Sequence, residues 1–162
     1  MRKILLIVSL FISFIVSASS LSENLNTYFT QLDSSENDSI SISINEKIKK
    51  EVLSFAEVDS NFYKTALDCK RIGSVISSDN KLKIISWNYK LSDGKFGYEA
   101  IIIKNSNKKK PKVKVWKASC KEAFKPADNK RYSLSKWYGA LYYNIIPWKG
   151  NYILLGYSTY NN

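Results

Sequence analysis

The sequence predicts an α+β protein in which two or three N-terminal helices pack on an antiparallel meander of about six strands. Two observations lead to this prediction. Apolar residues recur with a helical period of 3.6 before position 68, and from Ile72 onward they alternate with a period of two. The connections between these segments are short, which favours antiparallel pairing of sequential strands. We therefore expect one domain over residues 19–162, helical over 19–68 and a β-meander over 72–158.

Two amphipathic helices are expected in the helical part. One apolar stripe predicts a helix from Leu21 to Leu32, and a second stripe predicts a helix from Asn45 to Val58. Ser43 and Glu46 have the spacing of a capping box at the start of the second helix. The serine-rich segment 34–43 has no apolar period and is interpreted as an exposed linker, and residues 61–67 are a candidate for a short third helix.

The stretch from Lys81 to Lys104 is the clearest β-hairpin, with the turn Ser92-Asp93-Gly94-Lys95 between two strands. A turn over 78–81 links it to a preceding strand at 72–77. Both faces of the segment Trp137–Ile146 are apolar, which predicts a central strand. The remaining strands are expected at 112–116 and 152–157, and the segment 120–135 is expected to be a loop.

The first eighteen residues have the pattern of a signal peptide. Arg2 and Lys3 precede a thirteen-residue run from Ile4 to Val16 that is apolar except for Ser9 and Ser13, and small residues follow at a cleavage position. The alternative is a membrane anchor, but this run is shorter than the roughly 20 residues that a bilayer core requires. We therefore expect an exported protein, periplasmic or extracellular, with no transmembrane span after cleavage.

Cysteine and histidine content limits the chemistry. Cys69 and Cys120 form an even pair in an exported chain, which favours a disulfide, and two separate buried thiols are the alternative. The chain has no histidine, so Cys-His and Ser-His-Asp catalysis are both excluded. Of the carboxylates in the β part, only Glu99 with Asp128 is left as a pair that a glycosidase could use. We predict no catalytic residue, no metal site and no cofactor.

Positive charge is concentrated in the β part. Residues 19–80 carry six Lys or Arg against ten Asp or Glu, whereas residues 81–162 carry seventeen against four. The segment from Lys104 to Lys125, both included, contains nine lysines, and Glu122 is its only acid. A solvated edge strand and loop would explain them structurally. The functional interpretation is a binding face for a polyanion, and its candidate residues are Lys108, Lys109, Lys110, Lys112 and Lys114.

Aromatic side chains are the other candidate binding feature. Most of the tryptophans and tyrosines after position 86 are explained as sheet core and cross-strand pairs. Trp148 falls in the predicted turn between the last two strands, where a core role explains it least well. It is therefore the candidate for stacking on a sugar.

Several motifs resemble a group of uncharacterised exported bacterial proteins. The motifs are Ser78-Asp79-Asn80-Lys81-Leu82-Lys83-Ile84-Ile85-Ser86-Trp87, then Tyr142-Tyr143 with Ile145-Ile146-Pro147, then Leu154-Leu155-Gly156. They are similar to an S-D-x-K-L-x-I-x-S-W turn and strand and a Y-Y-x-I-I-P…L-L-G-W hairpin. This chain has Tyr157 where the pattern has Trp, and it ends at Asn162 where further strands are expected. The resemblance covers the β part and implies a secreted β-rich protein without a known activity.

These observations predict a non-catalytic binding or interaction module whose basic face meets an anionic partner. That partner is an anionic envelope surface or a polyanionic glycan, and no specific nucleic acid is predicted. The alternative is a divergent carbohydrate-binding or glycan-active protein that uses its surface aromatics.

Overall fold

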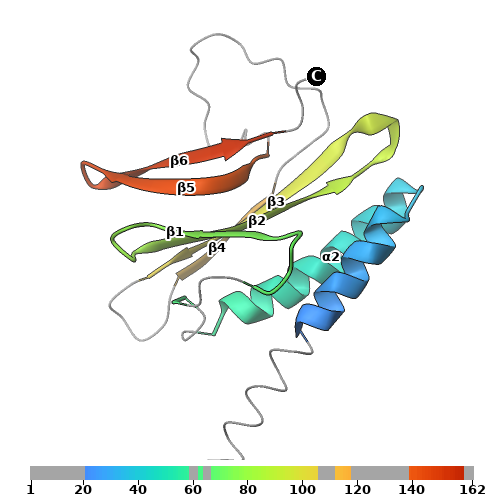
Figure 1. The fold of residues 1–162 in the computed structure, drawn as a ribbon, viewed down its shortest axis with the longest axis horizontal. Helices are drawn as coiled ribbons and strands as arrows, with labels where there is room; N and C mark the ends of the chain where they lie inside the picture. Colours follow the sequence, from blue (N-terminus) through green and yellow to red (C-terminus); the bar gives the residue numbers. More distant parts are fainter. Residues whose placement is uncertain (1–20, 59–61, 64–66, 106–111, 118–138, 159–162) are drawn as a thin grey trace, which may run out of the picture.

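The computed structural model describes residues 21–58, 62–63, 67–105, 112–117 and 139–158. Within these ranges the protein has three layers, namely two helices, a four-stranded sheet and a two-stranded hairpin (Figure 1). The helices lie on one face of the four-stranded sheet, and the hairpin lies on the opposite face. The predicted α+β class, with helices packed on antiparallel strands, is confirmed.

The helices confirm one prediction and correct another. The first helix covers residues 21–33, as its apolar stripe predicts. The second, α2, covers Asp38–Ala56 and begins well before the predicted start at Asn45. The side chain of Asn37 is its N-cap and accepts hydrogen bonds from the backbone N–H groups of Ser39 and Ile40.

A contact from a distant loop also holds the first turn of α2. The carboxylate of Asp38 accepts hydrogen bonds from the backbone N–H and the hydroxyl of Ser92, at 2.6 and 2.9 Å. The predicted exposed linker over residues 34–43 is therefore correct only for residues 34–37 and wrong from Asp38, where α2 begins. The serines of this segment give no apolar period from which a helix could be predicted. The start of the helix depends instead on the Asn37 cap and on the contact between Asp38 and Ser92.

The four-stranded sheet is a meander with strand order β1-β2-β3-β4. Its strands are antiparallel neighbours and include the predicted central hairpin. Gly94 in the short helix η2 (Ser92–Gly94) has a φ of 69°, the positive value that its place in the Asp-Gly pair predicts. The strands are β1 (Gly73–Ile76), β2 (Leu82–Lys90), β3 (Phe96–Lys104) and β4 (Lys112–Lys117).

The last hairpin forms a separate sheet of two strands, β5 (Leu141–Trp148) and β6 (Asn151–Tyr157). It stacks on β1 and β2 instead of extending their sheet, so the predicted single meander of about six strands is wrong in this respect. The backbone N–H of Tyr142 donates to the hydroxyl of Ser86 at 3.1 Å and links the two sheets.

Within the described residues β5 pairs with β6 alone, so the prediction of a central strand is also wrong, and a β-bulge decides which residues of β5 face inward. The register shifts between Tyr142 and Asn144, so that Tyr142 and Ile145 both lie on the inner face of the hairpin. Strict alternation would have placed these two residues on opposite faces. One face of β5 therefore packs on the larger sheet, and the other face leaves Ile146 and Trp148 exposed.

Two apolar clusters lie on opposite faces of the four-stranded sheet. The larger cluster joins both helices to the sheet through Ile85, Trp87, Ile101 and Ile103. The smaller cluster joins β2 and β3 to the hairpin and contains Leu82, Ile84, Ala100, Ile102 and Ile145. The predicted signal peptide, most of the predicted short helix at 61–67 and the predicted loop at 120–135 lie outside the described residues.

Candidate binding surface

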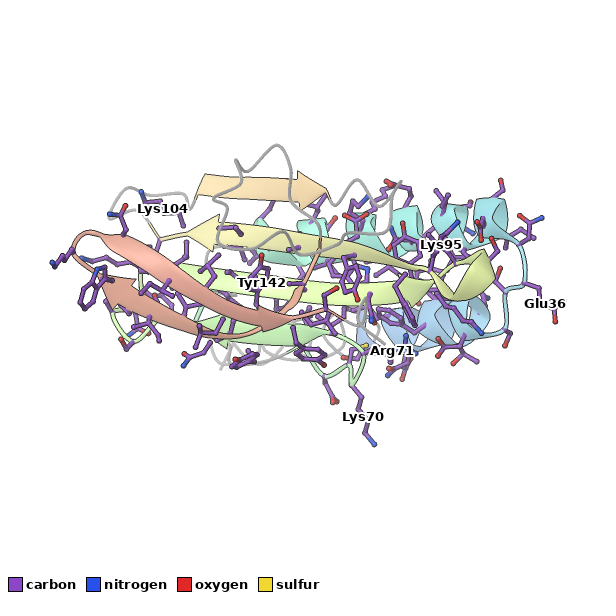
Figure 2. All side chains as sticks on the ribbon, turned by 90° about the horizontal axis from the view of Figure 1, so that it is seen from above. Glu36, Lys70, Arg71, Lys95, Lys104 and Tyr142 are labelled. Atoms are coloured by element: carbon purple, nitrogen blue, oxygen red, sulfur yellow. The ribbon has the colours of Figure 1, made fainter. Side chains whose placement is uncertain are left out.

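Three connections meet at one end of the molecule, which we call the turn end. They are the β1–β2 turn at 77–81, the end of β3 at Lys104 and Asn105, and the β5–β6 turn at Lys149 and Gly150. Figure 2 shows Lys104 and the hairpin tip at this end, and Lys95 and Glu36 at the opposite end. The backbone N–H of Asn105 donates to the carbonyl of Lys81 at 2.8 Å, which joins the first two connections.

Asp79 fixes the β1–β2 turn and ties it to the hairpin. Its carboxylate accepts hydrogen bonds from the Ser77 hydroxyl at 2.6 Å, the Lys81 backbone N–H at 3.2 Å and the Tyr152 hydroxyl at 2.9 Å. These donors, Ser77 foremost, lower the pKa of Asp79. The bond from Tyr152 therefore attaches β6 to the turn that carries Lys81.

The described lysines of the turn end are exposed. They are Lys81, Lys104 and Lys149, each from a different connection. The predicted binding residues Lys112 and Lys114 lie on β4, at the positions that pair with Lys104 and Ile102. The predicted residues Lys108, Lys109 and Lys110 lie outside the described residues, in the connection that leaves β3 after Lys104 and enters β4 at Lys112.

Trp148, the aromatic binding candidate, is 55% exposed. It is the last residue of β5, before a two-residue turn in which Lys149 and Gly150 have φ values of 45° and 77°. Positive φ at both central residues is the pattern of the type I′ turn, which suits the twist of a hairpin. The Lys149 Nζ lies 5.2 Å from the centre of the Trp148 ring, so a cation already contacts the aromatic system.

A cluster that sequence reasoning missed lies between α2 and the sheet. Glu99 is only 5% exposed, and its Oε1 lies 2.7 Å from Lys49 Nζ and 2.9 Å from Asn45 Nδ2. The indole N–H of Trp87 donates to Asn45 Oδ1 at 2.9 Å. Lys49 also pairs with Glu46 at the surface. The sequence did contain a signal for this cluster. Asn45 and Lys49 are polar residues four positions apart, beside the apolar stripe of α2, so they lie on the same side of the helix.

The geometry of this cluster indicates a role in holding α2 on the sheet and not a role in catalysis. Burial raises the pKa of Glu99, against the opposing effect of Lys49. Burial also lowers the pKa of Lys49, but the hydrogen bonds to Glu46 and Glu99 outweigh that effect and raise it overall. A carboxylate that is enclosed and already bound to an ammonium group has no access to substrate. The glycosidase interpretation of Glu99 with Asp128, which lies outside the described residues, is therefore not supported at Glu99.

The predicted disulfide is not present. Cys69 is a buried free thiol whose pKa is raised by burial, and Cys120 lies outside the described residues. The loop that holds Cys69 is instead tied to the first helix by the ion pair of Arg71 with Asp33, without a covalent link. A buried thiol at Cys69 agrees with the alternative of two separate buried thiols, of which only Cys69 lies within the described residues.

Two open hollows lie on the helical side of the described residues. A hollow of about 290 Å³ beside Lys49 is lined by residues of α2 and its C-cap, and another of about 590 Å³ lies where the first helix meets α2. In the ranges that the structure describes, no three His, Cys, Asp or Glu side chains gather as metal ligands. No helix in those ranges has the length and apolarity needed to cross a membrane.

The chain has no significant match to a protein-family model, a curated protein or a solved structure. The resemblance to exported bacterial proteins therefore stays a prediction. The turn end and the hairpin are the features on which a proposal about function can be built.

Proposed function

We propose that the protein is a non-catalytic binding module that holds an anionic partner at its turn end. The observation that carries this proposal is the meeting of exposed Lys81, Lys104 and Lys149 from three separate connections. Asp79, the acid closest to Lys81 in sequence, accepts three hydrogen bonds that hold this turn and the hairpin together, and its negative charge offsets only part of the positive charge of the three lysines. Lysines that approach an anionic surface contribute about 1 kcal/mol each to binding, so the three together strengthen binding by about 3 kcal/mol, a factor of roughly 100.

The sequence has further lysines directly after the end of β3. The connection between the end of β3 and the start of β4 carries Lys108, Lys109 and Lys110, and β4 itself carries Lys112 and Lys114. Exposed clusters of one sign raise both the rate of encounter and the affinity for a partner of opposite charge. Exported proteins with such a cluster meet acidic envelope lipids and acidic glycans.

The test compares two triple variants of equal net charge. Lys81, Lys104 and Lys149 are replaced by Gln in the first variant, and the exposed Lys47, Lys50 and Lys70 are replaced by Gln in the control. The protein is purified after export and its intact mass defines the N-terminus, which is the same in all variants. Binding to a sulfated polysaccharide and to anionic vesicles is measured at about 50 mM and about 200 mM salt.

We expect the turn-end variant to lose at least about tenfold in affinity at low salt, and the control to lose about twofold or less. Binding of the unchanged protein should weaken steeply between the two salt concentrations. Equal losses in the two variants would mean that total charge, and not the turn end, determines binding. Absence of binding to both probes at low salt would refute the proposal.

A second candidate function is supported by Trp148. Its exposed ring at the hairpin tip could stack on a sugar, and the neighbouring Lys149 could bind a carboxylate or sulfate group of the same glycan. A glycan array that compares the unchanged protein with Trp148→Ala tests this candidate. Equal signals from the two proteins would count against it.

A further inference from the structure

The outer face of the β5–β6 hairpin is an exposed apolar surface. The register pairs Ile146 with Ile153 and Trp148 with Asn151 on the face opposite the buried Ile145. Ile146 and Ile153 are 39% and 44% exposed although they face each other across the strands. Tyr157 lies on the same face by alternation, and Tyr143 lies in the bulge. These five apolar and aromatic residues, Tyr143, Ile146, Trp148, Ile153 and Tyr157, form what we call the hairpin face.

This concentration is unusual within the described residues. Nine large apolar side chains are exposed there, and five of them belong to this one hairpin. The other four are spread over α2, its C-terminus and Tyr63. Single exposed apolar residues are normal on soluble proteins, whereas a contiguous apolar patch marks a surface that meets another molecule or a membrane.

Charge indicates which partner fits. The hairpin has no Asp or Glu, and the last acid in the whole sequence is Asp128. The hairpin tip carries Lys149, and the Tyr152–Asp79 hydrogen bond places the tip beside the turn that carries Lys81. An apolar face beside a cationic end is complementary to a partner that has an apolar interior and a layer of negative charge at its surface.

We propose that the hairpin face docks into the interface of an anionic lipid bilayer, with the lysines of the turn end among the headgroups. This inference rests on the proposed function, because it identifies the anionic partner as a membrane surface. Trp and Tyr favour the headgroup level of a bilayer, and Ile146 and Ile153 gain by leaving water for the acyl boundary. The hairpin docks at the surface with its flat side and does not span the bilayer.

Other occupants explain less of this surface. A polyanionic glycan satisfies the lysines and Trp148 but leaves the Ile146–Ile153 pair in water. A second copy docked face to face would cover the isoleucines, but it would leave the lysines of the turn end without an anionic partner, because the hairpin has no Asp or Glu. A bilayer with anionic headgroups is the partner that accommodates both the apolar and the cationic residues.

The experiment replaces Ile146 and Ile153 by Thr, which is β-branched and suits a strand. The matched control carries the same substitutions at Ile40 and Ile42, which are also exposed but lie on α2. Co-flotation is measured with vesicles of phosphatidylcholine alone and with vesicles that contain about one third phosphatidylglycerol. Circular dichroism and thermal unfolding show that each variant is folded.

We expect Ile146→Thr with Ile153→Thr to bind anionic vesicles at least about tenfold more weakly, because two apolar side chains no longer enter the interface. The control should bind within about twofold of the unchanged protein. Binding to a sulfated polysaccharide should be the same in all three proteins, since the lysines are intact. In the unchanged protein, lipids with brominated acyl chains should quench Trp fluorescence, and Trp148→Phe should remove most of that quenching.

The outcomes separate this inference from the proposed function. Binding to the polysaccharide but not to anionic vesicles, or equal vesicle binding by both double variants, overturns the membrane inference and leaves the proposed function intact. Equal binding to neutral and anionic vesicles overturns the role given to the lysines. A concentration-dependent dimer in sedimentation that Ile146→Thr with Ile153→Thr abolishes would assign the hairpin face to a second copy and overturn the inference. Failure to bind any probe overturns both.

Discussion

The two faces of the four-stranded sheet are covered by very different amounts of protein. On the helix side, fifteen buried residues form one cluster that also encloses the Asn45–Lys49–Glu99 network. On the hairpin side, five buried residues suffice, and the covering hairpin is one sheet thick. Stability is therefore concentrated in the helix layer, whereas the hairpin layer leaves its own outer face available for binding.

The largest expected effect tests the buried ion pair of the helix side. Lys49→Met removes one partner and leaves Glu99 enclosed with only Asn45 as a donor. Breaking a buried pair in this way costs about 3 kcal/mol or more in the free energy of unfolding. The double variant Lys49→Met with Glu99→Gln should recover most of that loss, because no buried charge is left unpaired. Urea unfolding followed by circular dichroism measures both, and equal stabilities of the single and double variants would contradict the expectation.

Substitution of two neighbouring isoleucines of β3 compares the stability contributed by the two faces of the sheet. Ile101 lies in the large cluster and Ile102 in the small one, one residue apart. Leu or Ile to Ala substitutions in cores cost about 2–5 kcal/mol, and more where the surroundings cannot relax. We expect Ile101→Ala near the upper half of that range and Ile102→Ala near the lower end. Chemical unfolding of both variants measures the difference, and a larger loss at Ile102 would reverse the comparison.

The pH dependence of stability gives a smaller effect on the helix side. Burial raises the pKa of Glu99 above its ordinary value of 4.5. An acid whose folded-state pKa is raised contributes stability that is fully present below the unfolded pKa and is lost as pH rises through the folded pKa. The unfolding free energy of the unchanged protein relative to Glu99→Gln should therefore increase as pH falls from neutral towards about 4.5. A difference that does not change with pH would show that Glu99 keeps its ordinary pKa.

The smallest expected effect concerns binding at the turn end. Asp79→Asn removes one negative charge beside Lys81, while its amide oxygen can still accept from Ser77 and the Lys81 backbone and its amide N–H can donate to the Tyr152 hydroxyl. Affinity for anionic vesicles at low salt should rise about two- to fivefold. Asp68→Asn, an exposed change at another part of the surface, is the control and should have less effect. A rise of the same size in both variants would assign the effect to net charge alone.

Local patterns predicted the elements that short segments determine by themselves. The apolar stripe located the first helix, and the Asp-Gly pair located the loop in which Gly94 has a positive φ. The turn at 78–81 has its predicted Asx chemistry, since Asp79 accepts from the Lys81 backbone. The early start of α2 was missed because its N-cap, Asn37, lies inside the serine-rich segment 34–43, which has no apolar period and was interpreted as a linker.

The candidate site was predicted less completely. Trp148 was identified because it falls in a predicted turn, where a role in the core is a poor explanation for a tryptophan. The structure shows that its side chain is exposed. Lys81 and Lys149 were not singled out, since nothing in the sequence shows that their two turns are neighbours. The hairpin face was interpreted as a buried face of a central strand, because the bulge at Tyr142 and Asn144 has no sequence signal of its own.

The sequence by itself determined the helical and extended segments, their tight turns and the concentration of lysine after residue 80, because these depend on residues within a few positions of one another. The tertiary structure alone decided that the last hairpin stacks on the sheet instead of joining it, and that Glu99 meets Lys49. Such pairings depend on packing between segments that are fifty or more residues apart, and a side-chain pattern along one segment does not specify its distant partner.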